Sequence, residues 1–131
     1  MLRVQVMNGE INRGANKDEI IKMQNILENA LIEGSIGLST GLAYPAANDA
    51  PTEEIIELAK VLKKHNGIFT THMRNEGDNL VESVNETIKI GKLADVRTVI
   101  SHHKCAGRSN WGKSKETLKL IKEAKKEQNL D

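Results

Sequence analysis

Residues 97–105, RTVISHHKC, set the architecture that we expect for the whole chain. A β-branched run leads into two histidines and a lysine, which is the pattern of a short strand that ends in polar residues. A second run of this kind, IFTTHMR over residues 68–74, also ends near a histidine. Neighbouring parallel strands lie ~4.8 Å apart, so imidazoles at matching strand ends could reach one metal ion, at ~2.0–2.1 Å per zinc–nitrogen bond. We therefore expect the chemistry of this chain at His72 and His102.

Amphipathic helices separate these strands at about thirty residues per unit, a spacing that predicts βαβ crossovers and a parallel sheet. The first helix is expected to begin at Asn16, with Glu19 completing a capping box, and to stop at Gly34. Further helices are expected from Pro51, around Leu80, Val84 and Ile88 up to Gly91, and from Ser114. Short strands are predicted over residues 2–7 and 36–40, with a loop over residues 41–50.

Composition narrows the function classes. The chain has 131 residues, enough for one domain or part of one, and its formal net charge is +1. The scattered Lys and Arg do not indicate a nucleic-acid partner, and no apolar run approaches the ~20 residues needed to cross a bilayer. The single Cys105 rules out an internal disulfide and fits a reducing cytoplasm.

Side-chain parity predicts which histidines share a face. Ile68, Thr70 and His72 alternate onto one face of their strand, and Thr98, Ile100 and His102 do so on theirs. We expect both faces to point into the same interior and the two histidines to meet at one rim.

Other interpretations of the single residues stay open. A histidine at a strand end is more often a hydrogen-bonded polar residue than a ligand, and a catalytic zinc usually takes three protein ligands. His103 is expected to point away from His102, and His65 to be a cation at a helix end. Cys105 is either a thiolate ligand or, preferably, a small buried filler.

Residues 37–41, GLSTG, match the G-x-S-x-G pattern of the α/β-hydrolase nucleophile elbow. The elbow requires a helix directly after the serine, whereas a loop containing Tyr44 and Pro45 follows here. A serine hydrolase acting through Ser39 is therefore the least favoured alternative, and the glycines indicate a tight turn at a strand end.

Four motifs together carry a family resemblance. They are GLSTGLAYP at residues 37–45, THMRNEG at 71–77, ISHHK at 100–104, and Gly107 with NWG at 110–112. In this order, and across nearly the whole chain, they resemble the N-acyl-D-amino-acid deacylases (D-aminoacylases), a branch of the amidohydrolase superfamily.

The resemblance implies a zinc-dependent hydrolase on a (β/α)8 TIM-type barrel, acting on a small-molecule N-acyl-D-amino acid to release a carboxylate and a D-amino acid. By motif, His72 and His102 correspond to metal ligands on the fifth and sixth barrel strands. Lys104 corresponds to a lysine that faces the substrate carboxylate, and Tyr44 would line the pocket. Such a zinc ion lowers the pKa of its bound water toward ~7.

The chain also departs from the family pattern. The family's His-x-His pair, bridging cysteine and catalytic aspartate have no counterpart among these residues, so no catalytic residue is assigned here. We expect an α/β fold over residues 1–131, a central segment of the barrel with about three parallel strands and four helices. Such a segment is expected to be inactive by itself. The alternative function is a non-catalytic βα unit that forms a homo-oligomer through exposed sheet edges.

Overall fold

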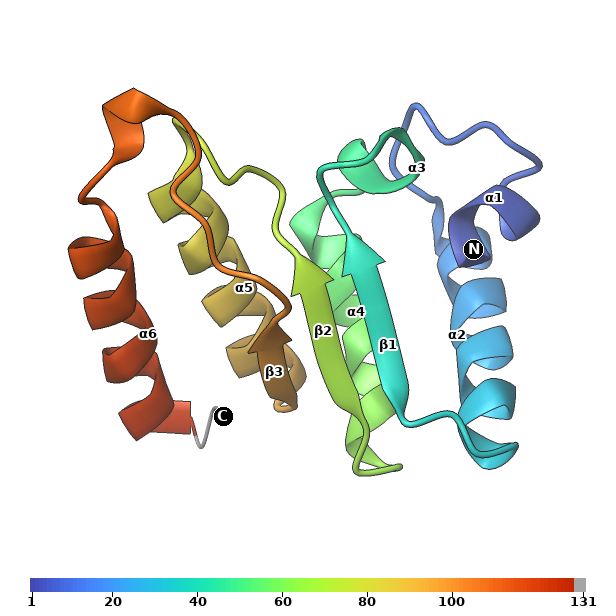
Figure 1. Cartoon of the computed structure of the whole chain (residues 1–131). Helices are drawn as coiled ribbons and strands as arrows, with labels where there is room; N and C mark the ends of the chain where they lie inside the picture. Colours follow the sequence, from blue (N-terminus) through green and yellow to red (C-terminus); the bar gives the residue numbers. More distant parts are fainter. Residues whose placement is uncertain (129–131) are drawn as a thin grey trace.

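Three parallel strands and six α-helices make up the part of the chain that the computed structural model describes, residues 1–128 (Figure 1). In chain order the elements are α1 (Leu2–Val6), α2 (Lys17–Ile32), β1 (Gly37–Gly41), α3 (Pro45–Asn48), α4 (Thr52–Lys63), β2 (Ile68–His72), α5 (Leu80–Ala94), β3 (Arg97–Ile100), the 3-10 helix η1 (Arg108–Asn110) and α6 (Ser114–Gln128). None of these helices is long and apolar enough to span a membrane.

The sheet has the order β1-β2-β3, and both pairs of neighbours are parallel. Helix α4 connects β1 to β2 and helix α5 connects β2 to β3, so the predicted βαβ crossovers are confirmed. The carboxyl ends of the strands consequently lie at one edge of the sheet, where Gly41 is the register partner of His72.

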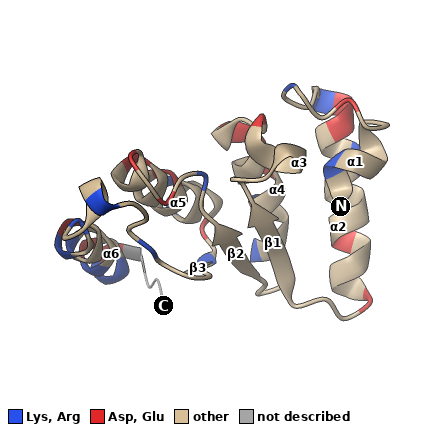
Figure 2. Ribbon diagram, turned by 45° about the horizontal axis from the view of Figure 1, so that its top comes forward, with Lys and Arg blue, Asp and Glu red and all other residues tan. Residues whose placement is uncertain are grey.

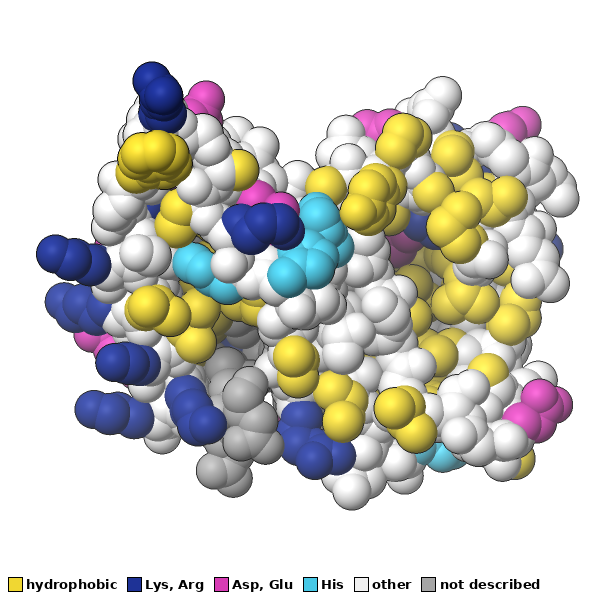
Figure 3. All heavy atoms as spheres, in the orientation of Figure 1, with side chains coloured by type: hydrophobic (Ala, Val, Ile, Leu, Met, Phe, Trp, Pro, Cys, Tyr) yellow, Lys and Arg dark blue, Asp and Glu magenta, His cyan; other side chains and the backbone are white. Residues whose placement is uncertain are grey.

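Helices α4 and α5 pack against one face of the sheet, with α2 beside α4 and α6 beside α5, and the other face is open (Figure 1). Phe69 and Thr98 are cross-strand partners, and both are buried on the helix side. The next residues along the strands, Thr70 and Val99, are also cross-strand partners. Both face the open side, where Thr70 is half-buried and Val99 is exposed. Figure 3 looks onto this open face and shows hydrophobic side chains over the strands and histidines near their upper ends.

The strands contribute little charge. Arg97 is the only Lys, Arg, Asp or Glu residue in the three strands. Figure 2 shows the acidic and basic residues spread over the helices and loops, as expected for solvated faces.

The start and stop signals of α2 are confirmed. The Asn16 side chain accepts from the backbone N–H of Glu19 at 2.9 Å, and the Glu19 carboxylate accepts from the backbone N–H of Asn16 at 2.8 Å. This reciprocal pair satisfies two of the N–H groups that a helix start leaves without partners. The helix ends at Ile32, and Gly34 takes a φ of +110°, a conformation that glycine adopts readily.

The predicted strand over residues 2–7 is wrong, because this segment forms helix α1. The buried residues are Arg3 and Met7, which lie one helical turn apart, so burial follows a helical period. The Arg3 guanidinium is paired with the carboxylate of Glu54 in α4 and donates to the carbonyl oxygen of Ala46 at 3.0 Å. An ion pair buried by tertiary packing thus overrides the alternating sequence pattern.

Two helix predictions also need correction. The predicted loop over residues 41–50 contains the single turn α3, which starts at Pro45 in keeping with the preference of proline for a first turn. Helix α5 does not stop at Gly91 but continues to Ala94. Gly91 is buried inside the helix, and the packing there outweighs the ~1 kcal/mol by which glycine disfavours a helix.

Candidate metal centre

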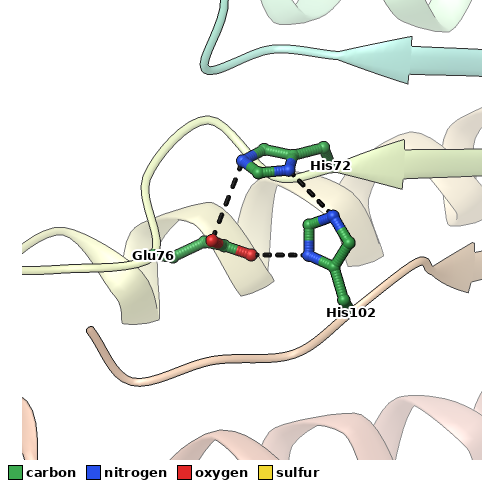
Figure 4. Close-up of side chains that lie close together, drawn as sticks. All are labelled: His72, Glu76 and His102. Carbon is green, nitrogen blue, oxygen red and sulfur yellow. Dashed lines mark hydrogen bonds and ion pairs between the residues drawn. The ribbon is translucent and has the colours of Figure 1, made fainter.

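Three side chains, one from a strand end and two from loops, converge at the carboxyl edge of the sheet (Figure 4). His72 is the last residue of β2, Glu76 lies in the loop that follows it, and His102 follows β3. One potential ligand atom from each residue lies within 4.8 Å of those of the other two. Within residues 1–128, this is the group of histidine, cysteine and acidic side chains with a geometry suited to a metal ion.

The two histidines approach each other directly. Nδ1 of His72 lies 2.9 Å from Nε2 of His102, and the ring centroids are 4.4 Å apart at an angle of 72°. Two unprotonated nitrogens at this distance would point their lone pairs at each other, so a proton or a cation must lie between them. The donor set fits zinc, which neutral imidazoles bind at ~2.0–2.1 Å.

Glu76 lies against the other nitrogens of the two rings. Its Oε1 atom is 2.9 Å from Nδ1 of His102, and its Oε2 atom is 3.7 Å from Nε2 of His72. The Lys104 ammonium donates to the same carboxylate, at 2.8 Å to Oε1 and 2.7 Å to Oε2. Burial raises the pKa of Glu76, but the hydrogen bonds from Lys104 and His102 and the positive charges nearby outweigh it, so the pKa lies below its ordinary value of 4.5.

The residues predicted to meet the substrate lie at the border of this cluster. The Tyr44 ring is 5.0 Å from the His72 ring, measured between centroids, and Tyr44 is 56% exposed. The Lys104 side chain is 50% exposed, so its ammonium is within reach of a ligand from solvent. Both residues are therefore accessible from the side on which the histidines meet.

Several candidates are not part of the cluster. His103 points away, as predicted, and its Nε2 atom is 2.8 Å from the Thr117 hydroxyl of α6. His65 lies at the end of α4, 3.5 Å from Glu28. Cys105 is a free thiol that packs against the apolar cluster of Met73, Leu80 and Val84. Ser39 lies inside β1 rather than at a turn from strand to helix.

The parity argument for His102 is wrong, although the two histidines do meet. Thr98 is buried among the helices, and Ile100 packs against the cluster around Met73, so these residues face away from the open side. Strand β3 ends at Ile100, and His102 lies in the bend that follows. The bend, rather than strand alternation, directs its ring toward His72.

Glu76 was not predicted as a site residue. Its separation from His72 by four positions, inside the motif quoted above, is the signal that could have indicated it. Its neighbour Arg74 has a different role, since its guanidinium donates to Glu86 of α5 at 2.8 Å and to the carbonyl oxygen of Ala50 at 3.0 Å.

Comparison with known proteins shows which solved structures share this fold. No family model matches the chain. One similar structure is the crystal structure of a D-aminoacylase, which defines a subset of the amidohydrolases. It superposes with a TM-score of 0.93 at 50% sequence identity and covers 97% of this chain and 27% of the D-aminoacylase chain. An N-acyl-D-glutamate deacylase from Bordetella bronchiseptica, solved with zinc and a phosphonate inhibitor, gives 0.92 at 37% identity, over 96% of this chain and 26% of that one.

The fold is thus that of one part of an amidohydrolase. Among curated proteins, the D-aminoacylase of Alcaligenes xylosoxydans xylosoxydans is 47% identical over 98% of this chain, and the N-acyl-D-aspartate deacylase of the same organism is 44% identical over 94%. The chain is thus similar in sequence and in structure to one part of the D-aminoacylases. It spans about a quarter of the length of these relatives, 26% and 25% respectively.

Proposed function

We propose that this chain forms part of the active site of a zinc-dependent hydrolase that cleaves the amide bond of N-acyl-D-amino acids. The observation that carries the proposal is the 2.9 Å approach of Nδ1 of His72 to Nε2 of His102 at the carboxyl edge of a parallel sheet. The names of the relatives support the substrate class, and the zinc in the Bordetella deacylase supports the metal.

His72 and His102 are the residues of this chain that would hold the zinc ion. Bound there, zinc would polarise the amide carbonyl and lower the pKa of a bound water. The (β/α)8 barrel expected from the sequence stays a prediction, in which these two histidines would lie on its inner rim.

Lys104 and Tyr44 would bind the substrate. The Lys104 ammonium has three donors, and its exposed side chain can turn from Glu76 to the carboxylate of an amino acid. The exposed Tyr44 ring would supply an apolar wall next to His72. Lys104 would thereby orient the substrate by its charged end.

Zinc titration of the 131-residue chain tests the metal site. Isothermal calorimetry at neutral pH should show weak binding of one zinc ion, because two histidines supply fewer ligands than the three that catalytic zinc usually has. His72→Ala and His102→Ala should each abolish the binding. His65→Ala removes a histidine near Glu28 instead and serves as the matched control. Equal zinc binding by all four proteins would contradict the proposal.

A specific feature of the sheet also favours self-association. Strands β1 and β3 are the edges of the sheet and have no partner on their outer sides within the described residues. Exposed apolar side chains lie beside both edges, with Ile36 82% and Val99 37% exposed. Unpaired strand edges next to apolar surface are templates for pairing with another chain. We propose that a second copy of this chain covers them, which is compatible with the zinc site.

A further inference from the structure

We infer that Glu76 is a positioning residue, which fixes the ring of His102 in its metal-binding tautomer and holds Lys104 with the same carboxylate, and that it is not a third metal ligand. The inference rests on the proposed function, since it assigns a task to His102 and to Lys104. It adds a residue and a role that the sequence motifs did not predict.

The choice of nitrogen atoms is the first observation. The nitrogens that face each other are Nδ1 of His72 and Nε2 of His102. Glu76 contacts the opposite nitrogen of each ring, Nδ1 of His102 at 2.9 Å and Nε2 of His72 at 3.7 Å. Figure 4 shows the carboxylate on the side of the rings away from their mutual contact. Glu76 therefore supports the rings from outside and leaves the facing nitrogens to one cation.

The tautomer of His102 follows from this contact. A carboxylate only accepts hydrogen bonds, so at 2.9 Å it favours a proton on Nδ1 of His102. A neutral imidazole with the proton on Nδ1 has its lone pair on Nε2, the atom that faces His72. Carboxylates that receive the second N–H of a ligating histidine orient many metal sites in this way.

The same carboxylate couples His102 to Lys104. The Lys104 ammonium reaches both carboxylate oxygens, and its Nζ atom also lies 2.7 Å from Nδ1 of His102. An ammonium only donates, so its approach to Nδ1 would also suit an unprotonated Nδ1; a protonated Nδ1 instead donates to Oε1 beside Lys104, and the Lys104→Met variant below distinguishes the two arrangements. One side chain thus sets the distance between the metal ligand and the lysine proposed to bind the substrate.

The backbone around Glu76 is suited to a positioning role. The carbonyl oxygen of Glu76 accepts from the N–H of Ala106 at 2.7 Å, which ties the loop after β2 to the loop after β3. The Asn75 side chain accepts from the N–H groups of Gly77 and Asn79, at 2.8 and 3.2 Å. The Glu76 side chain itself is 12% exposed. These bonds fix the backbone that carries the Glu76 carboxylate.

Histidine NMR tests the inference without metal or activity. In the metal-free, ¹⁵N-histidine-labelled chain at a pH where the rings are neutral, His102 should show the Nδ1–H tautomer. Glu76→Ala should shift it to the Nε2–H tautomer, whereas Glu76→Gln should retain Nδ1–H because the amide oxygen still accepts. Asp78→Asn removes a carboxylate two positions away that accepts from Asn110 and should change nothing, as the matched control. Lys104→Met should also leave the tautomer unchanged.

Two spectroscopic results would overturn the inference. One is a His102 tautomer that is the same in the wild type and in Glu76→Ala. The other is a wild type with the proton on Nε2 that changes in Lys104→Met, which would make Lys104 the partner of Nδ1.

Zinc affinity gives the second readout. Glu76→Ala should weaken zinc binding about 10–100-fold, as loss of such supporting residues does elsewhere. Glu76→Gln should lose less zinc affinity than Glu76→Ala, and Asp78→Asn should bind zinc as tightly as the wild type does. An equal loss of zinc affinity in Glu76→Gln and Glu76→Ala would identify Glu76 as a direct metal ligand and overturn the inference. A wild type that binds no zinc but shows the predicted tautomers would instead contradict the proposed function alone.

Discussion

Ser101 and Thr71 determine how His102 reaches His72. The backbone N–H of Ser101 donates to the carbonyl oxygen of Thr71 at 3.1 Å, one residue after Ile100 pairs with Thr71 in the sheet. This bond keeps the end of β3 against β2 while the chain bends, and His102 is the next residue. Two histidines that are 30 positions apart therefore meet at 2.9 Å.

The isolated 131-residue chain is expected to show no deacylase activity on N-acyl-D-amino acids, even with zinc added. The acidic residue next to the two histidines in the described part of the chain, Glu76, is ion-paired with Lys104. It is therefore unsuited to act as the general base for a bound water. A spectrophotometric assay for the free D-amino acid measures this, with a full-length D-aminoacylase as positive control. Zinc-dependent turnover that His72→Ala abolishes would refute the prediction.

Ser39 is expected not to act as a nucleophile. It lies inside β1 opposite Thr70, and no hydrogen bond joins its hydroxyl to a histidine within the described residues. A fluorophosphonate probe should leave it unmodified, as mass spectrometry of the intact chain would show, while a known serine hydrolase in the same tube is labelled. Stoichiometric labelling that disappears in Ser39→Ala would favour the serine-hydrolase alternative.

Self-association should increase with concentration. Apolar surface left in water costs ~25 cal/mol per Å², and the open sheet face and its edges would recover this free energy by pairing. Sedimentation velocity should give an average mass above 14.5 kDa that falls in Val99→Lys. Ile21→Lys changes an exposed residue on α2 instead, and its mass should match the wild type. A 14.5 kDa species at every concentration that also unfolds cooperatively would show that the chain is stable as a monomer.

Removing one partner of the Arg3–Glu54 pair should strongly destabilise the fold. The Glu54 side chain is 2% exposed, and it also accepts from the backbone N–H of Ala15 at 2.8 Å. Glu54→Ala leaves the guanidinium buried without its counter-ion, so the free energy of unfolding should fall by about 3–5 kcal/mol in urea titrations. Glu53→Ala, next to it, breaks only an exposed pair with Lys89 and should cost under ~1 kcal/mol. Equal effects of the two substitutions would show that burial of the pair is unimportant.

Acid should weaken the contribution of Glu19 to stability. Hydrogen bonds from Arg13 and from the backbone of Asn16 lower the pKa of Glu19 from 4.5 to about 2. Because the pKa is lower in the folded state, the stabilisation is present above the ordinary pKa and is lost as pH falls through the folded value. The difference in unfolding free energy between wild type and Glu19→Gln should therefore be largest near neutral pH and shrink toward pH 2.

A cap variant provides the control for this pH dependence. Asn16→Ala removes about 1 kcal/mol of capping without removing a titrating group, so its effect should change less with pH. A Glu19→Gln difference that is constant from neutral pH to pH 2 would contradict the assigned pKa shift.

The amino-acid sequence by itself determined the features that depend on residues close together in the chain. The capping box of Asn16 and Glu19 lies within four residues, and the β-branched runs define β2 and β3 almost to the residue. Helical spacing of apolar residues located the four long helices, and the crossovers followed from their alternation with strands. Propensity and periodicity act over a few residues, which is why they sufficed here.

Tertiary structure alone decided the features that join distant residues. Helix α1 exists because Arg3 is buried against Glu54, 51 positions away, and alternation in the sequence carries no information about that partner. Glu76 acquires its role because the fold brings Lys104 to it, 28 positions further along the chain. The direction of the His102 ring depends on a bend beyond the end of β3, where strand parity no longer applies. Such contacts form only when the folded chain brings distant segments together, since no local preference encodes a partner on another element.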